Sequence, residues 1–282
     1  MKQLERLDDL IHQYDVLFCD VCGVVHNGVS AYPAAIDALK RARAKGVTVI
    51  LVTNSPRPHQ GVEAQMLLLG VPEDAYDRVV TSGDVTRDLI AEGPRKVFHI
   101  GNERELSIYD GLGVELVEEF EASGVVCTGL FDDEVETPEN YTELLARLRS
   151  RDLPFICANP DIMVERGSRL IWCAGALARD YGQLGGRTLI AGKPHRPIYE
   201  AALHAAEEIR GSSIDKSRIL GIGDGVLTDV KGAAGFGLDV LYISGGVHAA
   251  DYTSDGSVDF DKMNVFLEKH GHRPVATLQA LI

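Results

Sequence analysis

Apolar runs that suit buried strands alternate with segments of helical periodicity along the chain. Residues 16–20 form a short apolar run that ends in an acid, and residues 47–53 are apolar and β-branched throughout. The second run predicts a strand buried on both faces. Residues 33–45 predict a helix between them, because Pro33 suits a first helical turn and Gly46 suits a stop.

The same rhythm continues to the end of the chain. Further helices are predicted at residues 61–69, at residues 138–149 and from about Asp229. Further short strands are predicted at residues 96–101, 114–117, 125–128, 154–158, 218–223 and 239–244. This βαβ order predicts a parallel sheet with helices on its faces.

Composition and charge narrow the classes of function. The 282 residues are 45% hydrophobic and 25% charged, which is enough apolar sequence for a sizeable core, and the net charge is −14. An acidic chain has no broad attraction for nucleic acid or anionic lipid, so neither is expected as a partner. No apolar stretch approaches a membrane span and the first residues lack a signal core, which together predict a cytoplasmic location.

Polar side chains follow the first two predicted strands, at the edge where open α/β sheets bind ligands. Asp20 ends the first strand and could serve as a nucleophile or a metal ligand. Thr53, Asn54 and Ser55 follow the second strand, where hydroxyls and backbone N–H groups can cradle an anion. When each of these two sites is taken alone, an ordinary turn or helix cap explains its residues better than a functional role does.

Two later segments of the chain contain further candidate site residues, one with a positive charge and one with negative charges. Lys193 stands at the entrance of a predicted helix, where the helix dipole disfavours a cation. It could balance clustered carboxylates or hold a phosphate, and an ordinary solvated surface lysine is the alternative. Asp224 and Asp229 follow a predicted strand and suit a divalent cation bound by oxygen. Cys19 and Cys22 form a C-x-x-C pair, but no second ligand pair has the spacing of a zinc site.

The joint order of these groups resembles the haloacid dehalogenase (HAD) superfamily. The resemblance rests on the GDGVLTD motif at residues 223–229, on TNSPRP, ANPD, CAGAL and AGKP, and covers essentially the whole chain. The middle segment is similar to the cap of subclass IIA, which is inserted between the second and third motifs. The resemblance implies a doubly wound, Rossmann-like α/β core at residues 1–80 plus 187–282, with a smaller α/β cap at residues 81–186.

The resemblance also implies a Mg²⁺-dependent hydrolase of phosphorylated small molecules. Asp20 would form an aspartyl-phosphate. Metal ligands would come from Asp20, Asp224 and a carbonyl near Cys22, with Asp229 orienting the site. The phosphoryl oxygens would bind Thr53, Lys193 and backbone groups near Asn54 and Ser55, and the cap would contribute Asn159 and Asp161 as substrate contacts or as an ordinary turn.

One position departs from the family pattern. Phosphatases of this superfamily carry an acid/base aspartate two residues after the nucleophile, where this chain has Cys22. A thiol has a pKa of about 8.5 and donates hydrogen bonds poorly, so alkyl phosphate esters are expected to react slowly. His26 is a candidate substitute. A non-hydrolytic Mg²⁺/phosphate-binding or regulatory protein, another reaction on the same scaffold, and a homodimer all stay open.

Overall fold

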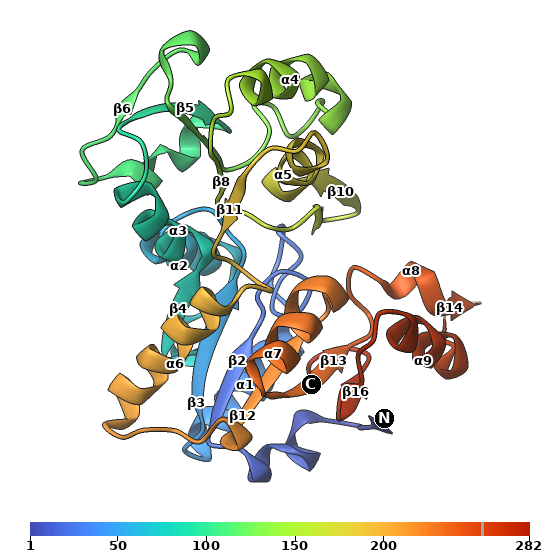
Figure 1. The fold of residues 1–282 in the computed structure, drawn as a ribbon. Coiled ribbons are helices and arrows are strands. Elements are labelled where there is room, and N and C mark those ends of the chain that lie inside the picture. The colour runs from blue at the N-terminus through green and yellow to red at the C-terminus, as the bar shows by residue number, and fades with distance from the viewer. Residues whose placement is uncertain (255–256) are drawn as a thin grey trace.

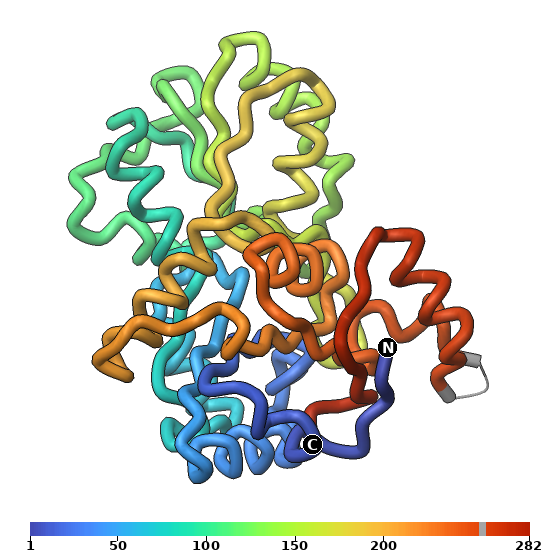
Figure 2. The backbone as a smooth tube through the Cα atoms, turned by 60° about the horizontal axis from the view of Figure 1, so that its bottom comes forward, coloured from blue at the N-terminus to red at the C-terminus, as the bar shows by residue number. Residues whose placement is uncertain are grey.

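The computed structural model describes residues 1–254 and 257–282 of the chain. The middle of the chain, green to yellow, forms one lobe, and the blue start joins the orange-to-red end in the other (Figures 1 and 2). Each lobe is built around its own parallel sheet. The doubly wound α/β architecture with a smaller inserted α/β part is thereby confirmed.

The larger sheet joins strands from both ends of the chain. Its neighbouring strands are all parallel. In spatial order, its described strands are β1 (Lys2–Gln3), β16 (Ala276–Leu278), β13 (Asp239–Ile243), β12 (Ile219–Gly223), β2 (Val16–Cys19), β3 (Thr48–Thr53) and β4 (Arg78–Thr81).

Side chains alternate between the two faces of this sheet, so each face has its own apolar core. Leu17 and Cys19 belong to the core that includes helices α1 and α2, whereas Val16 and Phe18 belong to the core that includes α6, α7 and α9. These helices span Pro33–Ala44 (α1), His59–Leu69 (α2), Arg196–Arg210 (α6), Lys231–Phe236 (α7) and Phe260–Lys269 (α9).

The smaller sheet comes from the middle of the chain and is also parallel. In spatial order, its described strands are β11 (Thr188–Ile190), β8 (Phe155–Cys157), β7 (Gly124–Cys127), β5 (Lys96–Ile100) and β6 (Glu115–Leu116). Helices α4 (Thr142–Ser150) and α5 (Ala174–Gln183) pack on one face, and α3 (Ser82–Ala91) packs on the other. An antiparallel hairpin of β9 (Met163–Arg166) and β10 (Arg169–Trp172) precedes α5.

Shorter elements complete the described chain. They are α8 (Ala249–Tyr252), the β14–β15 pair (Thr253–Ser254 and Ser257–Val258), the π-helical turn Val226–Val230 and the 3-10 turns Leu7–Asp9, Ile11–Gln13, Glu73–Ala75, Glu103–Tyr109, Glu119–Glu121, Pro138–Tyr141 and Lys216–Arg218. The predicted helix at residues 138–149 therefore starts as a 3-10 turn before α4. The helix predicted from about Asp229 starts as the π-helical turn before α7.

Several elements have no counterpart among the predicted ones, including β4, α3, the β9–β10 hairpin, α5, α9 and β16. The division of the chain at residues 80/81 and 186/187 stays a prediction. Strand β11 pairs with β8 in the smaller sheet, so the chain returns to the larger sheet only after Ile190.

Candidate active site

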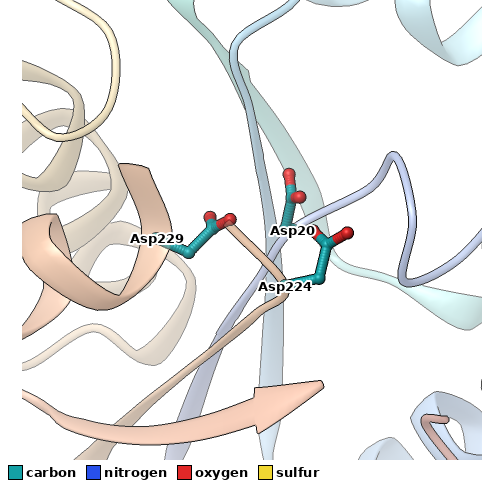
Figure 3. A group of neighbouring side chains, drawn as sticks. All are labelled: Asp20, Asp224 and Asp229. Atoms are coloured by element: carbon teal, nitrogen blue, oxygen red, sulfur yellow. The ribbon is translucent and has the colours of Figure 1, made fainter. Parts of the chain in front are cut away.

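Two neighbouring strands of the larger sheet place three aspartates together (Figure 3). Asp20 follows β2 directly and Asp224 follows β12 directly, and the Asp20 N–H donates to the Ile222 carbonyl at 2.8 Å. Asp229 lies in the π-helical turn Val226–Val230 that follows β12. One ligand oxygen from each of the three carboxylates lies within 4.8 Å of the others, in a buried setting.

A buried lysine enters this cluster from a distant part of the chain. Lys193 comes from the loop between β11 and α6, and its Nζ donates to Asp20 Oδ1 at 2.5 Å and to Asp229 Oδ1 at 2.6 Å. The Asn54 side chain holds the lysine backbone, accepting from Lys193 N at 2.7 Å and donating to Lys193 O at 3.2 Å. Burial alone lowers the pKa of Lys193, but the facing carboxylates raise it well above its usual value, so the ammonium stays charged.

Asp224 is the carboxylate that Lys193 does not bind. Its Oδ2 accepts the Val247 N–H at 2.8 Å, and burial raises its pKa well above the usual value, an effect that Asp20 and Asp229 increase. One lysine offsets only part of the charge on three buried carboxylates, which is an unfavourable state without a further cation. Oxygen donors of this kind are those that Mg²⁺ and Ca²⁺ prefer, so the residues present fit a divalent metal.

Glycines leave just enough room for Asp224. A Cβ on Gly23 would lie 2.3 Å from Asp224 Oδ2, and a Cβ on Gly246 would lie 2.0 Å from the same atom. Gly23 also has a φ of +85°, a left-handed conformation that side-chain-bearing residues rarely adopt. The two glycines therefore fix the close approach of the loops around the carboxylate.

In the loop after β3, Thr53 and Ser55 line the site, whereas the Asn54 side chain forms hydrogen bonds within the protein. Thr53 lines the hollow beside the aspartates, and its Oγ1 accepts the Ser55 N–H at 3.2 Å. The Asn54 amide is used internally, since its Nδ2 also donates to Asp161 Oδ1 at 2.8 Å. Ser55 lines the adjoining cavity, so Thr53 and Ser55 are better placed than the Asn54 side chain to meet a phosphoryl group.

The second lobe supplies Asn159 and Asp161 to the same junction. Asn159 Oδ1 accepts the Asp161 N–H at 3.1 Å, the turn that its sequence also suggests. Both residues line the adjoining cavity, and Asp161 also lines the hollow beside Asp20. Burial raises the pKa of Asp161 to about 6, while Lys193 and the amide of Asn54 oppose that rise. Asp161 therefore joins the two lobes through Asn54 and faces the site.

Cys22 and His26 line the cavity at the nucleophile loop. The Cys22 thiol donates to the Glu165 carbonyl at 3.6 Å, and burial, together with Asp20 and Asp224, raises its pKa. The His26 Nδ1 accepts the Gly28 N–H at 3.0 Å, and burial lowers the pKa of the imidazole to about 4. His26 is therefore neutral near neutral pH and holds a turn, which disfavours it as a substitute proton donor.

Sequence reasoning missed several side chains that line this cavity of about 150 Å³. They include Arg57, Glu105, Glu165, Arg166 and Trp172. The sequence did contain a signal for Arg57, because this residue lies within the SPRP segment that follows the second predicted strand. The others come from a 3-10 turn and a short hairpin whose positions relative to Asp20 depend on long-range packing.

Comparison with known proteins places the chain in a family. The sequence model of haloacid dehalogenase-like hydrolases matches residues 17–115, and a HAD-hydrolase-like model matches residues 190–262. The crystal structure of a hydrolase of the haloacid dehalogenase-like family from Brucella suis 1330 is 79% identical, with a TM-score of 0.91, and the match covers 99% of this chain and 100% of that one. The chain belongs to the haloacid dehalogenase-like hydrolase family.

Other members of this HAD family support the subclass IIA type. An acid sugar phosphatase of Staphylococcus aureus (strain USA300) is 27% identical over 254 residues, which are 87% of this chain and 92% of that protein. The crystal structure of a possible sugar phosphatase from Cytophaga hutchinsonii shares the fold, with a TM-score of 0.78 at 21% identity, over 99% of this chain and 98% of that one. Within residues 1–254 and 257–282, this HAD hydrolase has no helix with the length and apolar character needed to span a membrane.

Proposed function

We propose that this HAD hydrolase is a Mg²⁺-dependent phosphatase of small phosphorylated molecules that works through Asp20. The observation that carries the proposal is the convergence of Lys193 with Asp20, Asp224 and Asp229 in one buried cluster beside a cavity. A relative named acid sugar phosphatase supports a phosphate ester as the substrate class.

In this proposal, Asp20 is the group that attacks phosphorus. Lys193 binds one carboxylate oxygen of Asp20 and thereby holds the side chain at the end of β2. Attack by the carboxylate breaks the bond between phosphorus and the leaving oxygen and forms an aspartyl-phosphate, which water then hydrolyses. Lys193, Thr53 and Ser55 would bind the phosphoryl oxygens and stabilise their charge in the transition state.

Asp20, Asp224 and Asp229 would hold the Mg²⁺ ion, together with the backbone carbonyl of Cys22. When bound, the ion supplies a positive charge that stabilises the transferring phosphoryl group. Asp229 also accepts from Gly225 N at 3.1 Å and from Lys193, so it orients both the loop and the lysine.

Cys22 makes this a phosphatase with a weak proton donor. Its raised pKa keeps the thiol protonated, but a thiol donates hydrogen bonds poorly to a developing alkoxide. Esters with good leaving groups, such as aryl phosphates, need little help from an acid and should turn over fastest. The cytoplasmic location and the homodimer stay predictions.

Substitution of the nucleophile tests the proposal. We expect Asp20→Asn to lower hydrolysis of nitrophenyl phosphate by about 10³-fold or more, because an amide cannot form the covalent intermediate. The measurement is phosphate release with Mg²⁺ and after chelation, and chelation should also abolish turnover of the unaltered chain. The exposed Asp37→Asn on α1 is the matched control and should retain full activity.

Retained turnover in Asp20→Asn, or turnover that survives chelation, would contradict this mechanism. If the chain does not hydrolyse nitrophenyl phosphate but binds phosphate or vanadate only with Mg²⁺, it would instead be a binding or regulatory protein. Cys22 at the acid position is the observation that favours that second function.

A further inference from the structure

A second cavity lies in the larger lobe between α6 and α7, two helices that lie side by side (Figure 1). Its volume is about 390 Å³, within the roughly 300–1,000 Å³ of small-molecule sites. It shares no lining residue with the cavity beside Asp20 or with the hollow that contains the aspartates. It is therefore a space separate from the candidate active site.

The charged and titratable groups that line this second cavity are all basic. They are Arg196 at the start of α6, Lys231 at the start of α7 and His272 in the segment after α9. Among the described residues, no aspartate or glutamate lines it. The hollow beside Asp20 is the opposite, because five acids line it and it contains no basic side chain of the described chain. In a chain with a net charge of −14, such a local excess of basic groups is unusual.

Lys231 is the cation that the protein leaves without a counter-charge. Its side chain is exposed and has no ion pair or hydrogen bond with the residues that the structure describes. Burial lowers the pKa of His272, and His270 and Lys231 lower it further. Burial and Lys231 likewise lower the pKa of His195. Lys231 therefore faces other basic groups, and an anion placed among them would offset their repulsion.

Arg196 has hydrogen-bond donors to spare. Its Nε donates to Glu200 Oε1 at 2.6 Å, an exposed pair one helical turn apart, and its guanidinium lies 5.6 Å from the centre of the Phe236 ring. Its two Nη groups have no hydrogen-bond partner in the described part of the chain. A guanidinium fork of this kind suits the oxygens of a phosphate group.

Close packing fixes the two cations relative to one another. A Cβ on Gly232 would lie 2.4 Å from the Tyr199 hydroxyl and 2.8 Å from Pro194 Cα, so glycine is what allows α7 to approach α6. Pro194 and Gly232 both line the cavity, and they lie next to Arg196 and Lys231 in sequence. The basic groups are thus held around a preformed space, which lowers the entropy cost of binding a ligand.

We propose that this second cavity binds a small molecule that carries phosphate groups, and that Arg196 and Lys231 contact those groups. A small molecule fits better than a polymer, because the acidic remainder of the chain would repel nucleic acid or an anionic membrane. The inference goes beyond the proposed phosphatase function and does not depend on it, since the two sites share no residue.

Calorimetry with inorganic pyrophosphate, in a chelator and about 0.15 M salt, tests the proposal. Without a metal, the clustered aspartates repel an anion, so the heat reports on the second cavity. We expect binding of one pyrophosphate per chain, weakened about tenfold or more by Lys231→Met and by Arg196→Gln, as hydrogen bonds to charged groups predict. Lys231→Arg keeps the charge and should stay within about threefold of the unaltered chain. Lys96→Met, exposed at the start of β5 in the smaller lobe, is the matched control and should not change the affinity.

Thermal unfolding without pyrophosphate checks that the variants fold, which we expect because both altered side chains are exposed. The inference is overturned if the unaltered chain does not bind pyrophosphate, or if Lys231→Met and Arg196→Gln bind it as well as the unaltered chain does. It is also overturned if an oligonucleotide or anionic vesicles bind through Lys231 and pyrophosphate does not displace them. The assay contains no Mg²⁺ and measures no turnover, so failure of the phosphatase proposal would leave its outcome unchanged.

Discussion

The two lobes use the same sheet geometry for different chemistry. Each contains a parallel sheet, and loops at the carboxyl ends of both sheets line the same cavity. In the larger sheet, Asp20 directly follows β2 and Asp224 directly follows β12, and Asp229 lies in the turn after β12. The three clustered aspartates thus follow strands of the larger sheet, whereas loops after strands of the smaller sheet contribute Asn159, Asp161 and Lys193.

The hydrogen bonding of the two regions differs as well. Lys193 satisfies Asp20 and Asp229 directly, while Arg57 Nε and Glu105 Oε2 have no described partner. Carboxylates that a buried lysine holds in place are preorganised for one reaction. We infer that the reacting groups belong to the carboxylate cluster, and the variants below test its proton donor, its charge balance and its geometry in turn.

The largest expected effect comes from restoring an acid at position 22. Cys22→Asp should raise turnover of alkyl phosphates by about 10²–10⁴-fold, because a positioned carboxylic acid can protonate an alkoxide leaving group. Aryl phosphates should gain much less. The measurement is kcat for propyl and nitrophenyl phosphate in the unaltered chain and in the variant.

Cys22→Ser is the matched control for this change, since it alters polarity without supplying an acid, and it should leave alkyl turnover low. An equal gain on both esters, or no gain on either, would show that position 22 is not where proton donation is lacking. Thermal unfolding of Cys22→Asp should accompany the assay, because the new carboxylate lies close to Asp20 and Asp224.

The next effect concerns the charge balance of the cluster. Lys193→Met keeps a long apolar stem but leaves three buried carboxylates without their cation, so we expect a loss of about 3–5 kcal/mol in the free energy of unfolding. Urea denaturation in the presence of a chelator measures it, and added Mg²⁺ should recover part of the loss. The exposed Lys269→Met on α9 is the control and should change stability by less than about 0.5 kcal/mol. A loss below about 1 kcal/mol for Lys193→Met would contradict tight charge pairing.

The larger lobe was the more predictable from sequence, for a physical reason. Strands such as β3 are buried on both faces and read as continuous apolar runs, and acids directly after them mark the carboxyl edge. Asp20, Lys193 and Asp224 could therefore be assigned from local patterns and their order along the chain. The same patterns did not predict that the Asn54 side chain donates to Asp161 and accepts the backbone N–H of Lys193.

The cavity was much less predictable, because its residues come from short elements. The strands β9 and β10 span four residues each, too few for a clear period, and Glu105 lies in a polar 3-10 turn that resembles an exposed helix surface. Its burial depends on how the second lobe packs against the loop that carries Arg57. No local pattern contains that information.

The smallest expected effect tests how tightly the larger lobe holds Asp224. In Gly246→Ala the new Cβ would lie 2.0 Å from Asp224 Oδ2 and 2.4 Å from Asp224 Cβ, so the carboxylate or its loop must shift. We expect a loss of about 1–3 kcal/mol in stability, together with weaker Mg²⁺ binding measured by calorimetry. Gly235→Ala is the control, because it is exposed in α7 with no atom within 4 Å of the new Cβ and should be stabilising by about 0.5–1 kcal/mol. Unchanged Mg²⁺ affinity in Gly246→Ala would show that the position of Asp224 does not govern the metal site, and the carboxylate cluster would then be less preorganised than its contacts with Lys193 indicate.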